Sequence, residues 1–292
     1  MQPAADWTID QAWTRYTPDE HAVWRHLYDR QSRLLAGRAC DEYLAGLQAL
    51  PIGPDAIPDF ERLSKVLNRQ TGWRVVAVPG LLPDEVFFDH LANRRFPAGR
   101  FIRGADQLDY LQEPDVFHDV FGHLPMLMNR TMADFVQGYG VGGLRARSLG
   151  VLPQLARVYW HTVEFGLVRQ GQDLRILGAG ILSSSAEARF ALDDARPHRL
   201  CFDLARVMRT RYRIDDLQPA YFVLDSLEQL LELARTDFAP LYQQIAGLPA
   251  IEPGALVAGD RVMSRGAGGW HIGRSSAGQP APAGAGHTDG TG

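Results

Sequence analysis

The segment at residues 116–125, VFHDVFGHLP, constrains the fold most, because it sets two histidines in an apolar run. Such a run is expected to be buried, and burying two imidazoles costs free energy unless both find partners. For an arbitrary pair of histidines, one hydrogen bond to each ring is the ordinary solution. Among valine, phenylalanine and leucine side chains, a metal ion satisfies both rings at once, so we expect His118 and His123 to bind one.

The five-residue spacing of these histidines argues against one common metal site and requires a local distortion. Zinc peptidases of the HExxH type place their histidines at positions i and i+4 of a helix, with a glutamate between them as base. On an ideal helix at about 100° per residue, His118 and His123 lie about 140° apart. Both rings reach one ion only if the helix is distorted or ends between them, and Gly122 and Pro125 supply a reason for such a break.

A third ligand is expected from a carboxylate on another element, and Glu164 in YWHTVEFGL is the candidate. A lone glutamate on a helix is ordinarily solvated. Here the flanking residues are apolar and Trp160 lies one helical turn before Glu164 on the same face, which favours a coordinated carboxylate. Two histidines and one carboxylate with open positions form the facial triad of non-haem Fe(II) oxygenases, in which O2 and a co-substrate use the open positions.

The rest of the chain is expected to form many helices and a few short strands. Its 292 residues are 46% hydrophobic and 22% charged, which suffices for a substantial core without cross-links. Periodicity indicates helices from Thr17 onward and near residues 40–49, 59–70, 84–92, 131–140, 153–169, 185–192 and 226–236. β-rich runs lie at residues 74–78, 174–177 and 221–224, each too brief to build a large sheet. Capping boxes are expected at Thr17 with Glu20, Ser184 with Glu187, and Asp225 with Glu228.

Charge, cysteine content and hydropathy exclude several classes of protein. The net charge is -4, and basic and acidic residues are interspersed without a single-sign block, so no nucleic-acid partner is expected. Cys40 and Cys201 stand in no metal or redox spacing, which predicts free thiols in a reducing compartment. The sequence shows no signal peptide and no apolar run of about 20 residues, so we expect a cytoplasmic protein that does not associate with membranes. Its expected partners are small molecules.

Taken together, these segments resemble the pterin-dependent aromatic amino acid hydroxylases. The resemblance runs over residues 16–241 and is strongest in HDVFGH, LDYLQEPDVF, YWHTVEFGL, GAGILSS and VPGLLPDEVFFDHLANRRFP. It implies a mainly α fold with a few short β-strands, in a single catalytic domain of the aromatic amino acid hydroxylase type. It also implies an Fe(II) monooxygenase that uses O2 and a tetrahydropterin, either tetrahydrobiopterin or a bacterial analogue, to hydroxylate phenylalanine to tyrosine.

Carried over residue by residue, the resemblance assigns the iron to His118, His123 and Glu164. It assigns the substrate carboxylate to Arg103, which on sequence context alone is most often a surface cation. The remaining substrate contacts that it implies are Tyr110, Leu111, Pro114, Trp160, Phe165 and Ser183. The pterin contacts that it implies are Gly80, Leu82, Phe87, Asp119, Ala156 and Tyr159.

Three positions depart from the animal members of the family. Asp119 stands where they carry glutamate, Leu111 where they carry threonine, and Pro97 where a histidine usually contacts the pterin. These departures affect the cofactor and carboxylate contacts and leave the metal ligands unchanged. The chain also leaves no room for the regulatory domain or the terminal heptad helix of the animal enzymes, so we expect a monomer.

The expected domain organisation has three parts. Residues 1–15 form an N-terminal extension, and residues 16–262 form the catalytic domain. Residues 263–292 are rich in Gly, Ala, Ser and Pro and lack the apolar surface needed to offset ordering entropy, so we expect a disordered and dispensable tail. Within this tail, Trp270 is the side chain that could dock on the domain.

Other interpretations of the metal ligands remain open at this stage. A zinc hydrolase could use the same three side chains, although the HExxH glutamate is missing. A structural metal site in a helical binding module is a second alternative, although no fourth strong ligand stands nearby in the sequence. Tyrosine or tryptophan could replace phenylalanine as substrate, because the choice of ring depends on the shape of the pocket.

Overall fold

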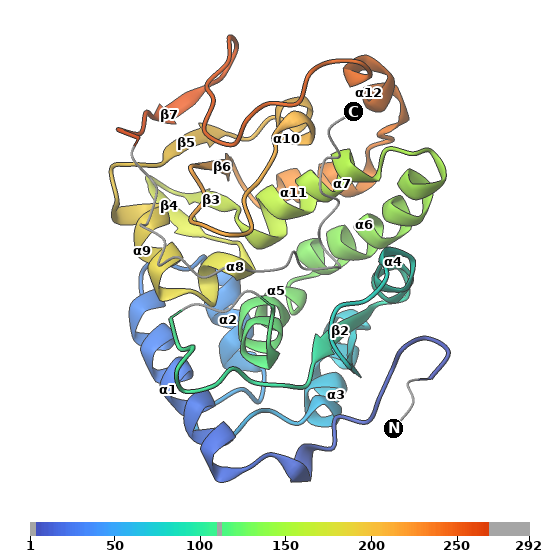
Figure 1. Cartoon of the computed structure of the whole chain (residues 1–292), viewed down its shortest axis with the longest axis vertical. Coiled ribbons are helices and arrows are strands. Elements are labelled where there is room, and N and C mark those ends of the chain that lie inside the picture. Colours follow the sequence, from blue (N-terminus) through green and yellow to red (C-terminus); the bar gives the residue numbers. More distant parts are fainter. Residues whose placement is uncertain (1–3, 110–112, 269–292) are drawn as a thin grey trace.

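The computed structural model describes residues 4–109 and 113–268, and most of its regular structure is helical (Figure 1). In chain order the helices are η1 (Trp13–Arg15), α1 (Pro18–Leu35), α2 (Asp41–Ala49), α3 (Phe60–Thr71), α4 (Asp84–Ala92), η2 (His118–His123), α5 (Leu124–Leu127), α6 (Arg130–Ser148), α7 (Leu152–Tyr159), η3 (Trp160–Glu164), α8 (Ala179–Leu182), α9 (Ser185–Asp193), α10 (Leu204–Arg209), α11 (Glu228–Arg235) and α12 (Ala239–Ile245). The strands are β1 (Arg74–Val78), β2 (Arg95–Gly99), β3 (Leu167–Gln170), β4 (Asp173–Ile176), β5 (His198–Cys201), β6 (Ala220–Leu224) and β7 (Val262–Ser264). The prediction of a mainly helical fold with a few short strands is confirmed.

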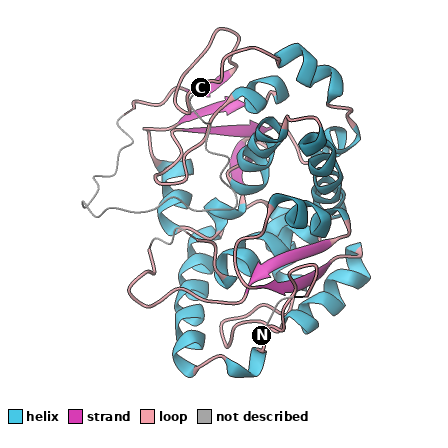
Figure 2. Cartoon of the chain, turned by 45° about the vertical axis from the view of Figure 1, so that its right-hand side comes forward, coloured by secondary structure: helices cyan, strands magenta, loops and turns pink. Residues whose placement is uncertain are grey.

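The strands form two small sheets that lie in different parts of the molecule (Figure 2). Strands β1 and β2 pair in parallel, and the other sheet has the order β4-β3-β6-β5-β7. Figure 1 shows this five-stranded sheet at one end of the molecule, α1 and α3 at the other, and α5 between them. The expected runs at 174–177 and 221–224 therefore join a larger sheet than their brevity indicated, because β3 pairs with both β4 and β6, β5 pairs with β6, and β7 extends the sheet from β5.

Helix α1 begins where the capping box predicts. The Thr17 hydroxyl accepts a hydrogen bond from the backbone N–H of Glu20, the Glu20 carboxylate accepts one from the backbone N–H of Thr17, and Pro18 occupies the first turn. These bonds satisfy N–H groups that an α-helix leaves without partners. On its buried face, α1 contributes Trp24 and Leu27 to the core.

Helix α4 lies close against α6 because two glycines of α6 carry no side chain. A Cβ on Gly140 would lie 2.3 Å from the backbone nitrogen of Ala92, and a Cβ on Gly143 would lie 2.0 Å from the ring of Phe88. No real Cβ tolerates such distances, so glycine is required at both positions. Phe87 of α4 lies edge-on to Tyr159 of α7, with 6.1 Å between the ring centroids.

The helix expected over residues 153–169 is shorter than predicted. It ends at Glu164, and the chain turns through Gly166 into strand β3. A Cβ on Gly166 would lie 2.3 Å from the carbonyl oxygen of Thr162, so this tight turn depends on a glycine that the apolar periodicity did not reveal. Glu164 therefore lies at the end of a helix rather than in the middle of one.

The capping box expected at Asp225 and Glu228 is wrong. Helix α11 begins at Glu228 with Leu227 before it, and the cap makes no side-chain hydrogen bond. The Asp225 carboxylate instead lies 3.6 Å from the guanidinium of Arg169 on strand β3. The box at Ser184 is present in part, since the Ser184 hydroxyl accepts the backbone N–H of Glu187.

Both ends of the described chain are bound to the domain. Ile9 forms a β-bridge with Ala77, and the indole of Trp13 donates to the carbonyl of Ile57. At the other end, Ser264 pairs with Arg199, and backbone hydrogen bonds continue to Gly268. Backbone hydrogen bonds thus continue past the expected boundary at residue 262, and Trp270 lies outside the described residues.

The remaining sequence expectations concern thiols and membrane spans. Cys40 and Cys201 are both free, as expected. Over residues 4–109 and 113–268, no helix is both long enough and apolar enough to cross a membrane.

Candidate metal centre and substrate pocket

The turn η2 is π-helical, and it places the two histidines on the same side of the helix. A π-helix forms its hydrogen bonds from i to i+5, so residues at that spacing lie nearly above one another. The Nε2 atoms of His118 and His123 are 3.2 Å apart. The distortion that the spacing requires is therefore present, and the helix continues through it into α5 rather than ending between the histidines.

Close packing against α8 accompanies this turn. A Cβ on Gly122 would lie 2.9 Å from the carbonyl oxygen of Ala179, so a larger residue would push the two segments apart. Pro125 follows directly, in the first turn of α5, where it has no backbone N–H to donate. Gly122 and Pro125 were expected to break the helix. Gly122 instead lies in the π-helical turn, and Pro125 lies in the α-helix that follows it.

Ser183 at the end of α8 fixes the orientation of the His118 ring. The Ser183 hydroxyl donates to the carbonyl of Ala179 over 2.8 Å and lies 2.9 Å from Nδ1 of His118. Because that hydroxyl proton is already used, Ser183 accepts from Nδ1–H, which leaves the lone pair of Nε2 free to bind a metal. Burial lowers the pKa of His118 to about 4, so the ring is neutral at pH 7, the state that ligates metals.

Glu164 comes from η3, a second π-helical turn at the end of α7. Its Oε1 lies 3.1 Å from Nε2 of His123, and its Oε2 lies 3.6 Å from Nε2 of His118. Although burial raises the pKa of Glu164, the two facing imidazoles hold that pKa below its usual range. The side chain is therefore an anion at pH 7.

The donor atoms of these three residues fit an iron ion. They all lie within 4.8 Å of one another, and ligands at right angles on bonds of about 2.1 Å are expected about 3 Å apart. Among the described residues, no further His, Cys, Asp or Glu joins this group. A three-ligand site of two nitrogens and one oxygen leaves positions open, which argues against a closed structural metal site.

These ligands face a pocket of about 180 Å³. It lies between the segment after β1, helix α4, strand β2 and the turns η2 and η3. Besides the metal ligands, the predicted site residues that line it are Gly80, Leu82, Phe87, Pro114, Asp119, Ala156, Tyr159 and Trp160. Lining residues that the sequence reasoning missed include Phe96, Gly99, Tyr139, Leu152, Pro153 and Tyr212.

One wall of the pocket carries the predicted pterin contacts. Phe87 and Tyr159 present adjacent rings, and Tyr159 is also nearly parallel to the ring of His123, with 6.4 Å between centroids. Asp119 accepts a hydrogen bond from the backbone N–H of Gly99 over 2.7 Å, and burial raises the pKa of Asp119 to about 7. Pro97, which replaces the expected histidine, lines the same pocket.

A second wall is built from stacked aromatic rings. The ring of Trp160 lies 4.1 Å from that of Tyr212 at an interplanar angle of 14°, and 4.8 Å from that of Phe165 at 29°. Phe165 is not among the residues that line the pocket, and neither is Ser183. Each contacts a residue that does line it: Phe165 stacks on Trp160, and Ser183 forms a hydrogen bond with His118.

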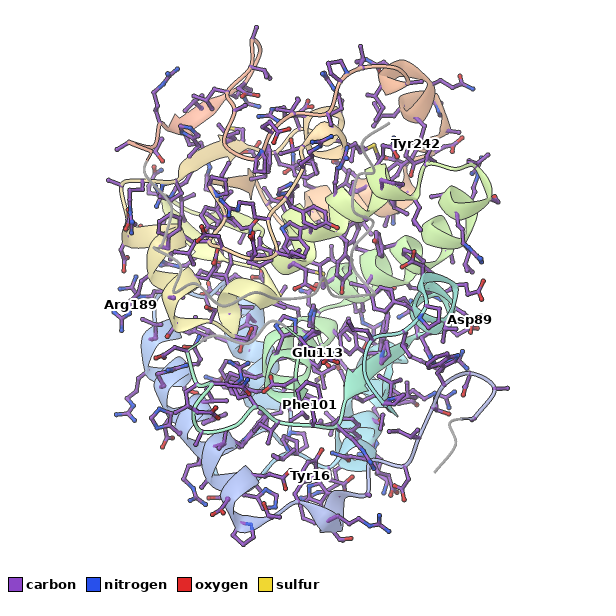
Figure 3. The ribbon with its side chains drawn as sticks, viewed as in Figure 1. Tyr16, Asp89, Phe101, Glu113, Arg189 and Tyr242 are labelled. Carbon is purple, nitrogen blue, oxygen red and sulfur yellow. The ribbon has the colours of Figure 1, made fainter. Side chains whose placement is uncertain are left out.

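Arg103 is buried rather than at the surface, on the segment that joins β2 to η2. Phe101 and Glu113 of that segment appear near the centre of the face shown in Figure 3. The guanidinium makes two hydrogen bonds of 2.9 Å to the carboxylate of Asp115, which also accepts the backbone N–H of His118 over 3.0 Å. Asp115 thus connects Arg103 to the metal-binding turn, and the sequence reasoning missed it.

Two predicted substrate contacts, Tyr110 and Leu111, lie outside the described residues.

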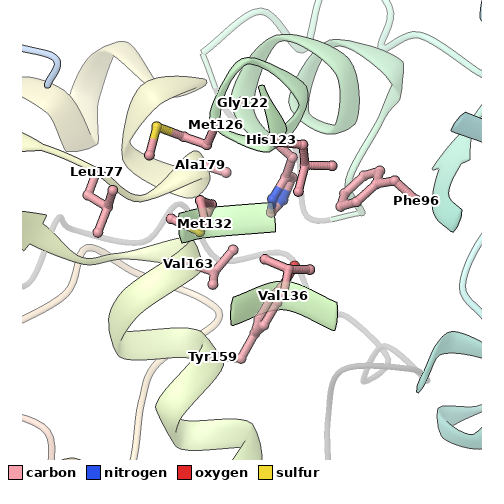
Figure 4. A pocket seen from close by; sticks show the side chains of 11 residues that line it. Phe96, Gly122, His123, Met126, Met132, Val136, Tyr159, Val163, Leu177 and Ala179 are labelled. Atoms are coloured by element: carbon pink, nitrogen blue, oxygen red, sulfur yellow. The ribbon is translucent and has the colours of Figure 1, made fainter. Parts of the chain in front are cut away.

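A small apolar cavity lies beside His123 (Figure 4). Phe96, Met126, Val136 and Val163 are among its lining side chains, and His123 is the residue that it shares with the metal site. These side chains shield the imidazole from water on this side. Such shielding strengthens the electrostatic interaction between His123 and Glu164.

Comparisons with known proteins agree with this geometry. A family model described as biopterin-dependent aromatic amino acid hydroxylase matches residues 9–245. The chain is 59% identical to the phenylalanine-4-hydroxylase of Caulobacter vibrioides over 89% of this chain and 89% of that protein. It is 58% identical to that of Ralstonia nicotianae over 89% of this chain and 83% of that protein. The crystal structure of Chromobacterium violaceum phenylalanine hydroxylase with bound oxidised Fe(III) superimposes with a TM-score of 0.87 and 53% identity, over 90% of this chain and 96% of that one.

Proposed function

The chain belongs to the biopterin-dependent aromatic amino acid hydroxylase family, and within that family we propose that it hydroxylates L-phenylalanine to L-tyrosine with O2. Its cofactors are Fe(II) and a tetrahydropterin. The observation that carries the substrate assignment is the pocket in which an aromatic wall, Trp160 with Tyr212, lies beside the three facing metal ligands. Relatives with up to 59% identity that are named phenylalanine-4-hydroxylase support the choice of ring.

We propose that His118, His123 and Glu164 hold the iron. Their donor atoms, their burial and the neutral state of the His118 ring support this assignment. When bound, the iron and the reduced pterin together supply the activation of O2 that an amino acid side chain cannot provide. Ser183 keeps Nε2 of His118 aimed at the ion by accepting from Nδ1.

The two aromatic walls divide the pocket between the two organic substrates. We propose that Phe87 and Tyr159 stack against the pterin, with Gly80, Leu82, Asp119 and Ala156 beside them. Asp119 orients this side by fixing the backbone at Gly99. The wall around Trp160, with Pro114 across the pocket, receives the amino acid ring.

We propose that Arg103 binds the substrate carboxylate. Asp115 takes the Nε and Nη2 edge of the guanidinium, and Nη1 retains donors for a second carboxylate. The bidentate contact with Asp115 holds the planar group in one orientation, which lowers the entropic cost of binding substrate. Tyr110, Leu111, Phe165 and Ser183 complete the proposed substrate site.

The direct test is single-turnover chemistry. The protein is loaded anaerobically with Fe(II), and O2, a tetrahydropterin and phenylalanine, tyrosine or tryptophan are then added in separate reactions. Tyrosine formed from phenylalanine, in an amount that matches the pterin oxidised, is the expected product. Hydroxylation of tyrosine or tryptophan in preference to phenylalanine would contradict the proposed substrate.

We further propose that the enzyme works as a cytoplasmic monomer without a nucleic-acid partner. Residues 16–262 form its catalytic domain, to which the hydrogen-bonded residues up to 268 are added. The interspersed charges and the net charge of -4 support the absence of a nucleic-acid partner. Light scattering of the iron-loaded protein over a range of concentrations tests the oligomeric state.

A further inference from the structure

A chain of buried hydrogen bonds runs from the aromatic wall into the protein. The indole Nε1 of Trp160 donates to Oε1 of Gln218 over 3.1 Å. The backbone N–H of Gln218 donates to Oε1 of Glu187 over 3.0 Å, and the hydroxyl of Tyr221 donates to the same oxygen. Gln218 is 2% exposed and Glu187 is 5% exposed, so water does not substitute for these partners.

Gln218 also holds the segment that carries the other ring of the wall. Its side-chain amide donates to the carbonyl of Arg213 over 2.7 Å and to that of Asp216 over 3.4 Å. Tyr212, which precedes this segment, stacks on Trp160. One side chain therefore ties together both rings that border the substrate side of the pocket.

Glu187 is an unusual residue for this position. In a full capping box its carboxylate would bond to the backbone N–H of Ser184, but here it turns inward to Gln218 and Tyr221. Burial raises its pKa to about 7, so keeping a carboxyl group here costs free energy that an apolar side chain would not. Glu187 has no assigned role in the proposed metal site or on the pterin side of the pocket.

We propose that Glu187 is a positioning residue for the substrate ring: through Gln218 it sets the place of the Trp160 and Tyr212 pair, and so determines which aromatic ring the pocket accepts. This inference rests on the proposed function, since it concerns the amino acid substrate of the same site. Two stacked rings 4.1 Å apart move together, so a shift of Gln218 moves the whole wall. The width of the pocket beside Glu164 therefore changes when Trp160 and Tyr212 shift.

The test compares three variants with the wild-type enzyme. Glu187→Ala removes the acceptor, Gln218→Met removes the partner of the indole, and Glu187→Gln keeps an oxygen that can accept from both Gln218 and Tyr221. Ser184→Ala is the matched control, because it weakens the start of the same helix without touching these bonds. Calorimetry gives the Kd of phenylalanine, and steady-state kinetics give KM for phenylalanine and pterin and the preference for phenylalanine over tryptophan.

For Glu187→Ala and Gln218→Met we expect the Kd and KM of phenylalanine to rise about tenfold and its preference over tryptophan to fall about tenfold, while KM for the pterin changes less than about twofold. Glu187→Gln and Ser184→Ala should stay within about twofold of wild type throughout. If Glu187→Ala does not fold, the constants measured for Gln218→Met test the inference instead. Wild-type values in the folded variants, or the same shifts in Ser184→Ala, overturn the inference. A wild-type enzyme that fails to hydroxylate phenylalanine overturns the proposed function instead.

Discussion

At the scale of single residues, the proposed metal site rests on three side chains, and no other His, Cys, Asp or Glu of the described residues joins them. Replacing His118, His123 or Glu164 with Ala is expected to reduce bound iron to near zero and to lower turnover by about 100-fold or more, while the helical circular dichroism is retained. Metal analysis by mass spectrometry after desalting checks the iron content. Full iron occupancy in all three variants would mean that the metal is held elsewhere.

Ser183→Ala serves as the graded comparison for these ligand variants. It removes the hydroxyl that accepts from Nδ1 of His118 but leaves every ligand in place. We therefore expect iron affinity to fall by about 10- to 100-fold rather than vanish. Equal iron loss in Ser183→Ala and the ligand variants would show that their effect is not specific to coordination.

Arg103→Lys tests recognition of the substrate carboxylate. Lysine cannot hold Asp115 in a bidentate contact and also present a fixed donor to the substrate carboxylate as Nη1 of Arg103 does, and a hydrogen bond to a charged group contributes about 1.5–3 kcal/mol. KM for phenylalanine should rise by about 10- to 100-fold, with KM for the pterin much less affected. An equal rise in both constants would assign Arg103 to the support of Asp115 and the metal-binding turn alone.

At the scale of secondary-structure elements, helix α9 carries a buried acid that makes stability depend on pH. Burial raises the pKa of Glu187 from its ordinary 4.5 to about 7, with Asp216 and Tyr221 facing it. Above pH 4.5 the unfolded chain releases this proton before the folded chain does, so the contribution to stability falls as pH rises to about 7 and then stays constant.

Glu187→Gln removes this titration while keeping the shape of the side chain. The variant should therefore gain stability relative to wild type between pH 5 and pH 8, by at most about 3 kcal/mol. Urea unfolding at several pH values measures the difference. Parallel stability curves for the two proteins would show that Glu187 does not titrate in this range.

The elements also show how far the sequence predicted the structure. The start signal at Thr17 and Glu20 was confirmed and the one at Asp225 and Glu228 was wrong, while the three candidate metal ligands stood out because buried polar groups in apolar runs need partners. The turn at Gly166 depends on a close approach to the carbonyl of Thr162, and the sheet partners of β6 lie elsewhere in the sequence; apolar periodicity encodes neither. Asp115, Gln218 and Tyr212 were missed for the same reason.

At the scale of the whole molecule, the C-terminal end of the domain is set by strand β7. A chain that ends at residue 268 keeps the pairing of β7 with β5 and the hydrogen bond from Gly266 to Nδ1 of His198. A chain that ends at residue 261 loses both. Each strand contact removed is expected to cost stability, because it leaves backbone groups of β5 without protein partners.

We expect the chain ending at residue 268 to melt within about 2 °C of the full-length protein, and the chain ending at residue 261 to melt at least about 4 °C lower. Steady-state turnover at 25 °C should be nearly equal in the longer truncation and the full chain. Differential scanning calorimetry of the three proteins checks this. A large loss of stability in the longer truncation would show that residues after 268 contribute to the fold.

The π-helical turns at His118–His123 and Trp160–Glu164 form their hydrogen bonds over five residues, where an α-helix forms them over four. Loss of one residue between the two histidines would restore α-helical winding and leave them four residues apart, a spacing that still places both rings on one side of the helix. Among distant relatives, a one-residue gap in an alignment at this turn would therefore be compatible with iron binding, provided that both histidines and the glutamate are retained.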